Sequence, residues 1–396
     1  MKRREFLKLS VIGAAAAAAS PLRIEAEEKP LTVQKYRTLG KTGLKMSDVS
    51  FGTGKLPSAS MILRAVDRGM NYFDTAPDYG QAEKYLGEAM KKLKRDKIIV
   101  ASKFCNPLQY PAHLPAGTKK EEYVKAVEAS LARLNTDYLD ICFVHAIGEN
   151  KNDQGQEMKR LMDEEMFSAA EALKKAGKIR FLAVSSHGPN NLDELLTAAV
   201  KSGRFDVVMM AFNFMKFPTQ PAILKEAAAR GVGVIAMKTL AGAKDMNFDA
   251  KGETFETAAL KWVLKHPEVA GLVITIKSIE DLDLYLQASG KDFSASDERV
   301  LDLYARRFGS EYCRTGCGEC QPLCPNGVEI ASTLRYQMYF KDYGSEKLAM
   351  TSYAALKNKA ENCADCGLPD CTAACPYGLN VKGMLIEAHN TLSFNV

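Results

Sequence analysis

Short apolar runs alternate with amphipathic helical patterns over most of the chain. Apolar positions recur at helical spacing in residues 121–134, 167–176 and 256–265, which predicts helices that bury one face. Between such segments, short and strongly apolar runs predict buried strands. These runs begin near Val49, Asn71, Lys97, Tyr138, Ile179, Val207, Val232 and Leu272.

This alternation is typical of α/β proteins with a parallel sheet. Eight strands, seven intervening helices and one more helix after the last strand predict a closed (β/α)8 TIM barrel. A doubly wound open sheet is the alternative, because it shares the alternation. That alternative is weakened because no Gly-x-Gly-x-x-Gly follows the first strand.

The last third of the chain differs in composition, because it holds eight of the ten cysteines. They form two runs, each followed by proline: Cys313-x3-Cys317-x2-Cys320-x3-Cys324 and Cys363-x2-Cys366-x4-Cys371-x3-Cys375. This pattern predicts two 4Fe–4S clusters, in which the fourth cysteine of each run ligates the other cluster. One cluster then takes Cys313, Cys317, Cys320 and Cys375, and the other takes Cys363, Cys366, Cys371 and Cys324.

Helical patterns at residues 294–308, 331–343 and 347–359 surround the cysteine runs, with Ser294 or Ser296 as the first N-cap. The region therefore looks like a mostly helical ferredoxin-type module. Zinc is the alternative metal, because Cys-x2-Cys pairs also bind zinc. The clustering of the cysteines argues against a dispersed disulfide framework.

The N-terminus carries a twin-arginine motif, Lys2-Arg3-Arg4-Glu5-Phe6-Leu7-Lys8, followed by an alanine-rich apolar run and small residues to Ala19. This order predicts export by the twin-arginine translocase to the periplasm or another extracytoplasmic compartment, with cleavage after Ala19 or Ala26. An uncleaved signal would associate the protein with the membrane. The alternative is a frayed basic terminus.

The net charge gives no sign of nucleic-acid binding. Residues 1–19 carry a net +3, so without them the formal charge of +5 falls to +2. No basic stripe with interleaved aromatic residues is present in the sequence. Nucleic acid is therefore not an expected partner.

Three of the predicted strands lead into polar residues. Residues 71–76 place Asp74 at a strand end and Tyr79 five positions later, while the next two runs end at Lys103 and His145. Side chains of a strand alternate between two faces, so Asp74, Lys103 and His145 share the face of the apolar residues two positions before them. In a parallel barrel these groups can converge at the C-terminal ends of the strands.

The residue types indicate acid–base chemistry. A free tyrosine has a pKa of about 10, and an ammonium group beside it lowers that pKa. Lys103 can supply the ammonium, with Asp74 holding it charged, and His145 can hydrogen-bond a substrate oxygen. Together they would polarise a carbonyl and protonate it as hydride arrives. The structural alternative is that Tyr79 and His145 pack at the barrel mouth beside a Lys103–Asp74 ion pair.

These four residues, in this order, resemble the catalytic tetrad of the aldo-keto reductases. The resemblance extends from residues 36–44, Tyr-Arg-Thr-Leu-Gly-Lys-Thr-Gly-Leu, to Lys277 and Ser278. It implies an oxidoreductase acting on a small carbonyl or alcohol substrate, with Tyr79 as the acid and base. The resemblance also implies a nicotinamide site. Its residues would be Ser185 and Ser186 for the carboxamide, and Lys238, Thr239, Leu240, Ala241, Gly242, Lys277 and Ser278 for the phosphates.

The sequence departs from the family pattern at this nicotinamide site. Asp283 stands where the family has an arginine that grips the 2′-phosphate, and a carboxylate there repels a phosphate. Met209 replaces an expected glutamine, and Met237 replaces the aromatic residue that stacks on the nicotinamide. These departures argue against NADPH and, less strongly, against NADH. The alternative to a nicotinamide is that the clusters deliver electrons one at a time.

The predicted organisation has three parts: a signal peptide and linker at 1–30, an aldo-keto reductase-like barrel at 31–292, and a two-cluster domain at 293–396. The expected function is an exported iron–sulfur oxidoreductase that exchanges electrons with a redox partner protein. The alternative is a non-catalytic electron-transfer protein whose barrel is a docking scaffold. Of the two remaining cysteines, Cys142 is expected to face the helix layer and Cys105 to lie in a loop.

Overall fold

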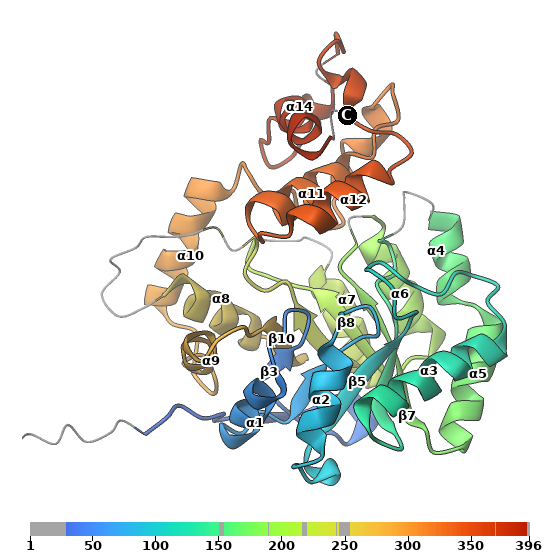
Figure 1. Cartoon of the computed structure of the whole chain (residues 1–396). Helices are drawn as coiled ribbons and strands as arrows, with labels where there is room; N and C mark the ends of the chain where they lie inside the picture. Colours follow the sequence, from blue (N-terminus) through green and yellow to red (C-terminus); the bar gives the residue numbers. More distant parts are fainter. Residues whose placement is uncertain are drawn as a thin grey trace, which may run out of the picture. The chain divides into compact units, whose positions relative to one another are not determined.

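A computed structural model describes residues 29–149, 154–188, 190–215, 220–242, 244, 254–368 and 370–393. Eight parallel strands close into a barrel in the order β10-β3-β4-β5-β6-β7-β8-β9 (Figure 1). They are β3 (Val49–Gly52), β4 (Tyr72–Asp74), β5 (Ile99–Phe104), β6 (Leu139–Val144), β7 (Ile179–Ser186), β8 (Val207–Ala211), β9 (Gly233–Met237) and β10 (Val269–Thr275). The predicted TIM barrel is confirmed, and the doubly wound alternative is wrong. The predicted signal peptide lies outside the described residues.

Helices surround the barrel. They are α1 (Ala59–Asp67), α2 (Ala82–Met90), α3 (Lys120–Leu134), α4 (Gln154–Leu161), α5 (Glu164–Lys175), α6 (Leu192–Ser202), α7 (Gln220–Arg230), α8 (Phe255–Leu264) and α9 (Ile279–Leu286). Of these, α3, α5 and α8 follow the predicted amphipathic runs, and α4 is a second helix between β6 and β7 where one was expected. Local signals set their ends. The side chain of Asp163 accepts a hydrogen bond from the N–H of Glu165 and begins α5. Asn135 adopts a left-handed conformation and ends α3.

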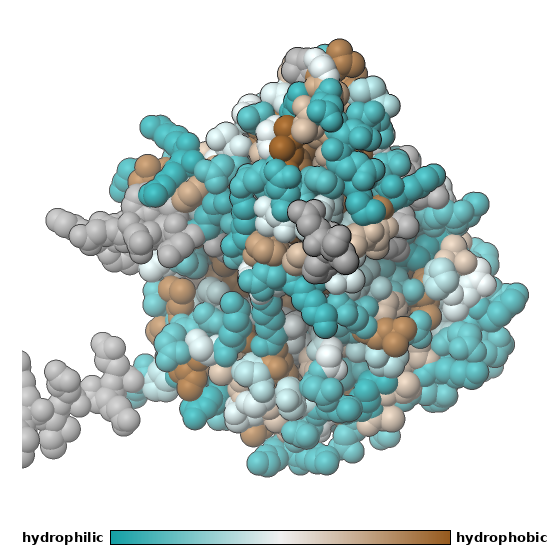
Figure 2. Space-filling view, turned by 45° about the horizontal axis from the view of Figure 1, so that its top comes forward, coloured by the Kyte–Doolittle hydropathy of each residue, from teal (hydrophilic) through white to brown (hydrophobic). Residues whose placement is uncertain are grey.

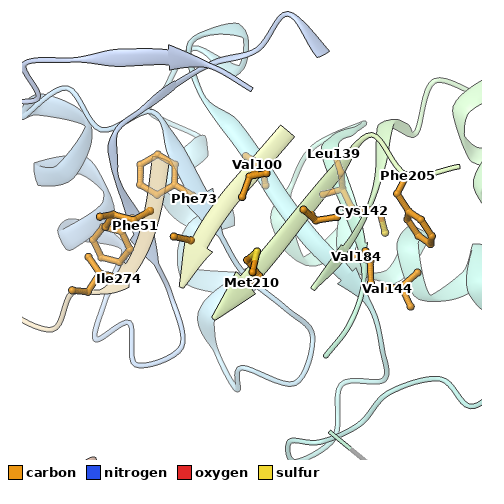
Figure 3. Close-up of a cluster of buried hydrophobic side chains, with 14 of the residues drawn as sticks. Phe51, Phe73, Val100, Leu139, Cys142, Val144, Val184, Phe205, Met210 and Ile274 are labelled. Carbon is orange, nitrogen blue, oxygen red and sulfur yellow. The ribbon is translucent and has the colours of Figure 1, made fainter. Parts of the chain in front are cut away.

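The strands bury both faces, and each face belongs to a different apolar cluster. The cluster inside the barrel includes Tyr72, Ile99, Ala101, Ile141 and Phe143. The cluster beneath the helices includes their neighbours in sequence, Phe73, Val100 and Cys142 (Figure 3). The phase assigned to Asp74, Lys103 and His145 is therefore confirmed, and so is the outward orientation of Cys142.

A hairpin that the sequence analysis did not predict packs against the barrel interior. It pairs β1 (Tyr36–Thr38) with β2 (Lys45–Ser47) in antiparallel fashion. Leu39, Leu44 and Met46 from the hairpin join the cluster inside the barrel. Each strand has only three residues, too few for the alternation of polar and apolar positions to be recognisable.

The cysteine region follows α10 (Ala295–Phe308), which begins at a capping box formed by Ser294 and Asp297. Ser294 is therefore the N-cap and Ser296 is not. The remaining helices are α11 (Ile330–Lys341), α12 (Glu346–Ala354), α13 (Asp370–Ala373) and α14 (Val381–Leu392). Residues 31–396 form one compact unit, in which α11 and α12 lie between the barrel and α14 (Figure 1). Within the described residues, every helix is too short or too polar to cross a membrane.

Candidate active site and cluster ligands

The four predicted tetrad residues lie together at the C-terminal ends of β4, β5 and β6. The Nζ of Lys103 donates to the two carboxylate oxygens of Asp74 at 2.7 and 2.8 Å, and to the carbonyl of Thr75 at 2.7 Å. The same ammonium lies 5.2 Å from the centre of the Tyr79 ring. The rings of Tyr79 and His145 meet edge to face, with centroids 5.8 Å apart.

Burial sets the protonation of this group. It raises the pKa of Tyr79 well above the ordinary value, and the nearby carboxylates of Asp74 and Asp78 raise it further. The expected lowering of the Tyr79 pKa is therefore wrong: burial and the two carboxylates raise it, and Lys103 donates its hydrogen bonds to Asp74 and Thr75. Burial also holds the pKa of His145 well below its usual range. Tyr79 is consequently a neutral phenol beside a neutral imidazole.

The connection between β5 and α3 brings further aromatic groups that the sequence analysis missed. The ring of His113 lies edge to face with that of His145 at 4.9 Å between centroids, and Tyr110 does so at 5.7 Å. The Oδ2 of Asp78 lies 3.6 Å from the Nδ1 of His145. The sequence offered one signal for a larger polar group at the mouth: the chain has only five histidines, and two of them, His145 and His187, come directly after a strand.

The residues predicted to hold a nicotinamide make other contacts. The Oγ of Ser185 accepts a hydrogen bond from the N–H of Ala146 at 2.9 Å, and the hydroxyl of Ser186 donates to the carbonyl of Ile147 at 2.8 Å. Both serines thus brace the connection after β6. Lys277 is exposed, and Ser278 begins α9 by accepting from the N–H of Asp281.

The predicted phosphate loop, residues 238–242, packs against the cysteine region. The Nζ of Lys238 lies 3.4 Å from the hydroxyl of Tyr339 and 5.1 Å from the ring centre of Tyr343. The hydroxyl of Tyr304 donates to the carbonyl of Ala241 at 2.9 Å. Thr239 is buried and Leu240 is half-buried, and a Cβ on Gly242 would lie 3.3 Å from the Tyr312 ring.

Asp283, the departure from the family pattern, forms a 2.6 Å ion pair with Arg68. Together with the covered Lys238, this arrangement does not fit a dinucleotide lying over residues 238–242.

Arg335 of α11 connects the cysteine region to the barrel mouth. Its guanidinium donates to the carbonyl of His187, and to the Oγ1 of Thr315 at 3.1 Å. Glu149 lies 3.0 Å from the Nδ1 of the same histidine. Burial alone would raise the pKa of Glu149, but His187 and Arg335 outweigh it and hold that pKa below its usual range. A charged network therefore joins α11 to the connections after β6 and β7.

The eight clustered cysteines fall into two groups in space. Cys313, Cys317, Cys320 and Cys375 line one cavity of about 20 Å³. In the second group, burial and the neighbouring thiols of Cys324, Cys371 and Cys366 raise the pKa of Cys363 to about 11. Each group thus contains three thiols from one run and the fourth from the other, as the sequence predicts. The donor set suits iron–sulfur clusters, which are held by four thiolates each.

Comparisons with known proteins agree with this division. A sequence model of the aldo/keto reductase family matches residues 52–247, and one of a 4Fe-4S dicluster domain matches residues 312–379. The dicluster domain and its eight cysteines indicate two 4Fe–4S clusters.

Three similar proteins illustrate the match. An uncharacterized oxidoreductase of Bacillus subtilis, YqkF, is 30% identical over 64% of this chain and 91% of its own. L-galactose dehydrogenase of Arabidopsis thaliana is 27% identical over 64% and 87%, respectively. The solved structure of a putative aldo-keto reductase from Pseudomonas aeruginosa is 25% identical, with a TM-score of 0.53 over 66% of this chain and 97% of that one. This chain belongs to the aldo/keto reductase family, as an oxidoreductase that carries a 4Fe–4S dicluster domain.

Proposed function

We propose that this protein reduces a small carbonyl compound, or oxidises the corresponding alcohol, with electrons that pass through its two clusters. One observation carries the proposal. A cavity of about 30 Å³ lies in the cysteine region where it meets the end of β9, and its walls include Arg335, Tyr343, the predicted cluster ligand Cys313 and, from the barrel, Lys238. The contacts of Arg335 with His187 and of Tyr339 with Lys238 also hold the cysteine region against the C-terminal ends of β7 and β9, on the side of the barrel where the tetrad lies.

The tetrad supports proton transfer in this reaction. Reduction of a carbonyl to an alcohol consumes two electrons and two protons. Tyr79 is the donor to the carbonyl oxygen, because its phenol lies at the barrel mouth beside the Lys103 ammonium and the His145 ring. Lys103 and Asp74 keep a fixed positive charge beside the Tyr79 ring, and His145 orients the substrate oxygen. Bound 4Fe–4S clusters supply electrons singly, so the second proton comes from solvent.

An external one-electron donor protein would reduce the clusters. The face shown in Figure 2 is mostly hydrophilic, with apolar side chains in small, scattered groups. Contacts between redox proteins are transient and bury little area, so they need no large apolar patch. We therefore propose a soluble redox protein as the partner.

The source of the hydrogen on carbon tests the proposal. Anaerobically reduced holoprotein is mixed in D2O with a panel of aldehydes and ketones, and the alcohols are analysed by mass spectrometry. We expect alcohol without added nicotinamide, with deuterium on the carbinol carbon. Hydrogen transferred from deuterium-labelled NADH or NADPH, with no product in their absence, would show that the protein is instead a nicotinamide-dependent reductase.

A non-catalytic electron-transfer protein is the second candidate. The contact of Tyr339 on α11 with Lys238 favours this candidate. It makes the predicted phosphate loop a docking surface for the cysteine region. This candidate predicts no alcohol with any substrate, together with undiminished electron transfer to a partner when Tyr79 is replaced by phenylalanine.

We also propose export by the twin-arginine route, supported by Arg3 and Arg4 ahead of the alanine-rich run. Replacing both arginines by lysine should leave the protein inside the cell, whereas Lys8→Arg, which keeps the motif, should not. Fractionation of cells that express a C-terminally tagged chain measures this. Equal export of the two variants would contradict the proposal.

A further inference from the structure

Asp78, His113 and His145 form a compact group at the barrel mouth. Each offers one ligand atom, and the three atoms lie within 4.8 Å of one another. Asp78 follows β4, His113 lies between β5 and α3, and His145 follows β6. The tertiary fold therefore assembles two imidazoles and one carboxylate from three separate connections.

Four polar atoms of this group are buried without hydrogen-bond partners, while the Oδ2 of Asp78 accepts a hydrogen bond from the N–H of Ala112 at 3.3 Å. Both ring nitrogens of His113, the Nδ1 of His145 and the Oδ1 of Asp78 make no hydrogen bond within the described residues. The distance of 3.6 Å between the Nδ1 of His145 and the Oδ2 of Asp78 is too long for one. A buried polar group left unpaired costs about 1–3 kcal/mol, so this arrangement would be expensive unless something else binds there.

We propose that Asp78, His113 and His145 bind a divalent transition-metal ion, specifically Zn²⁺. Two imidazole nitrogens and one carboxylate are a ligand set of catalytic zinc sites, which keep a further position open. Zinc ligands at about 2.0–2.2 Å stand roughly 3.4 Å apart around a tetrahedral ion. The three atoms lie within 4.8 Å of one another, so they would have to approach by up to about 1.4 Å to reach that spacing. Magnesium and calcium are disfavoured, because they prefer all-oxygen sites.

The site would support the tetrad. A zinc ion on the Nδ1 of His145 leaves the ring proton on Nε2, so the imidazole can donate to a substrate oxygen. The ion would also lie close to Tyr79, whose ring contacts that of His145. Zinc binding itself does not depend on turnover, so it stands or falls separately from the proposed function.

Zinc binding to the holoprotein tests the site. Protein purified anaerobically is treated with a weak chelator, incubated with one equivalent of ZnCl2 and desalted, and zinc and iron are measured together. We expect one zinc alongside about eight irons, the content of two four-iron clusters. Loss of a residue that only supports a metal ligand costs about 10- to 100-fold in metal affinity. Loss of a ligand itself should cost more, so His113→Ala and Asp78→Asn should each weaken zinc binding by at least about 100-fold. His266→Ala, at a histidine between α8 and β10 that is outside this group, should leave zinc binding unchanged.

Zinc-edge X-ray absorption of the wild-type protein separates this site from the cysteines and needs no variant. Three protein ligands of nitrogen and oxygen at about 2.0–2.2 Å are expected, whereas zinc trapped by cysteines has sulfur at about 2.3 Å. Either a sulfur shell or wild-type protein that retains no more zinc than His113→Ala would overturn the proposal.

Discussion

Tyr79→Phe should lower the rate of carbonyl reduction by about 10²- to 10⁴-fold, the usual contribution of a positioned acid or base. Only one hydroxyl is lost, and the hydrogen bonds of Lys103 to Asp74 and Thr75 remain. The variant should therefore fold and keep its clusters. The measurement is alcohol formed per reduced protein in a single anaerobic turnover, which isolates the chemical step from the supply of electrons.

Tyr85→Phe is the matched control. Tyr85 lies half-buried on α2 and packs against the cluster beneath the helices; unlike Tyr79, it has no ring contact with His145 or Lys103 among those found in the described residues. It should keep the wild-type rate. If Tyr79→Phe also keeps that rate, Tyr79 is not the proton donor, and the structural interpretation of the tetrad is the better one.

Cys324→Ala should remove one whole cluster, and that cluster should be the one built on the other cysteine run. Iron should fall from about eight to about four per chain. The exchanged ligand explains why: Cys324 lies with Cys363 and Cys371, not with the earlier cysteines of its own run. The cysteine region should also lose stability, because metal binding and folding are coupled. The barrel should remain folded, because its two apolar clusters come from residues 33–288.

Thiol alkylation under anaerobic conditions, read by mass spectrometry, identifies the lost cluster. In Cys324→Ala, the thiols of Cys363, Cys366 and Cys371 should become reactive, while those of Cys313, Cys317 and Cys320 stay protected. Cys375→Ala, the reciprocal variant, should give the opposite pattern. Loss of protection within the run that carries the substitution would instead show that each run holds its own cluster.

The sequence by itself determined the barrel and the cluster ligands, because both are written in short-range patterns. Runs of buried residues marked every barrel strand, and the phase of each run put Asp74, Lys103 and His145 on the inner face. Cysteine spacing together with the following prolines identified the ligand groups that the fold then brings together. Such patterns can be recognised in the sequence because the alternation of a strand repeats every two residues, and because most ligands of one cluster lie within about ten residues of one another.

The surroundings of those groups were decided by the tertiary structure. Whether Lys103 meets the phenol or the Asp74 carboxylate depends on packing, and so does the burial that raises the pKa of Tyr79. The contact between Lys238 and α11 joins residues 101 positions apart, and the meeting of Asp78 with His113 depends on how the connection after β5 folds over the mouth. No local sequence pattern predicts such contacts, since they form only when elements distant in sequence pack together above the barrel.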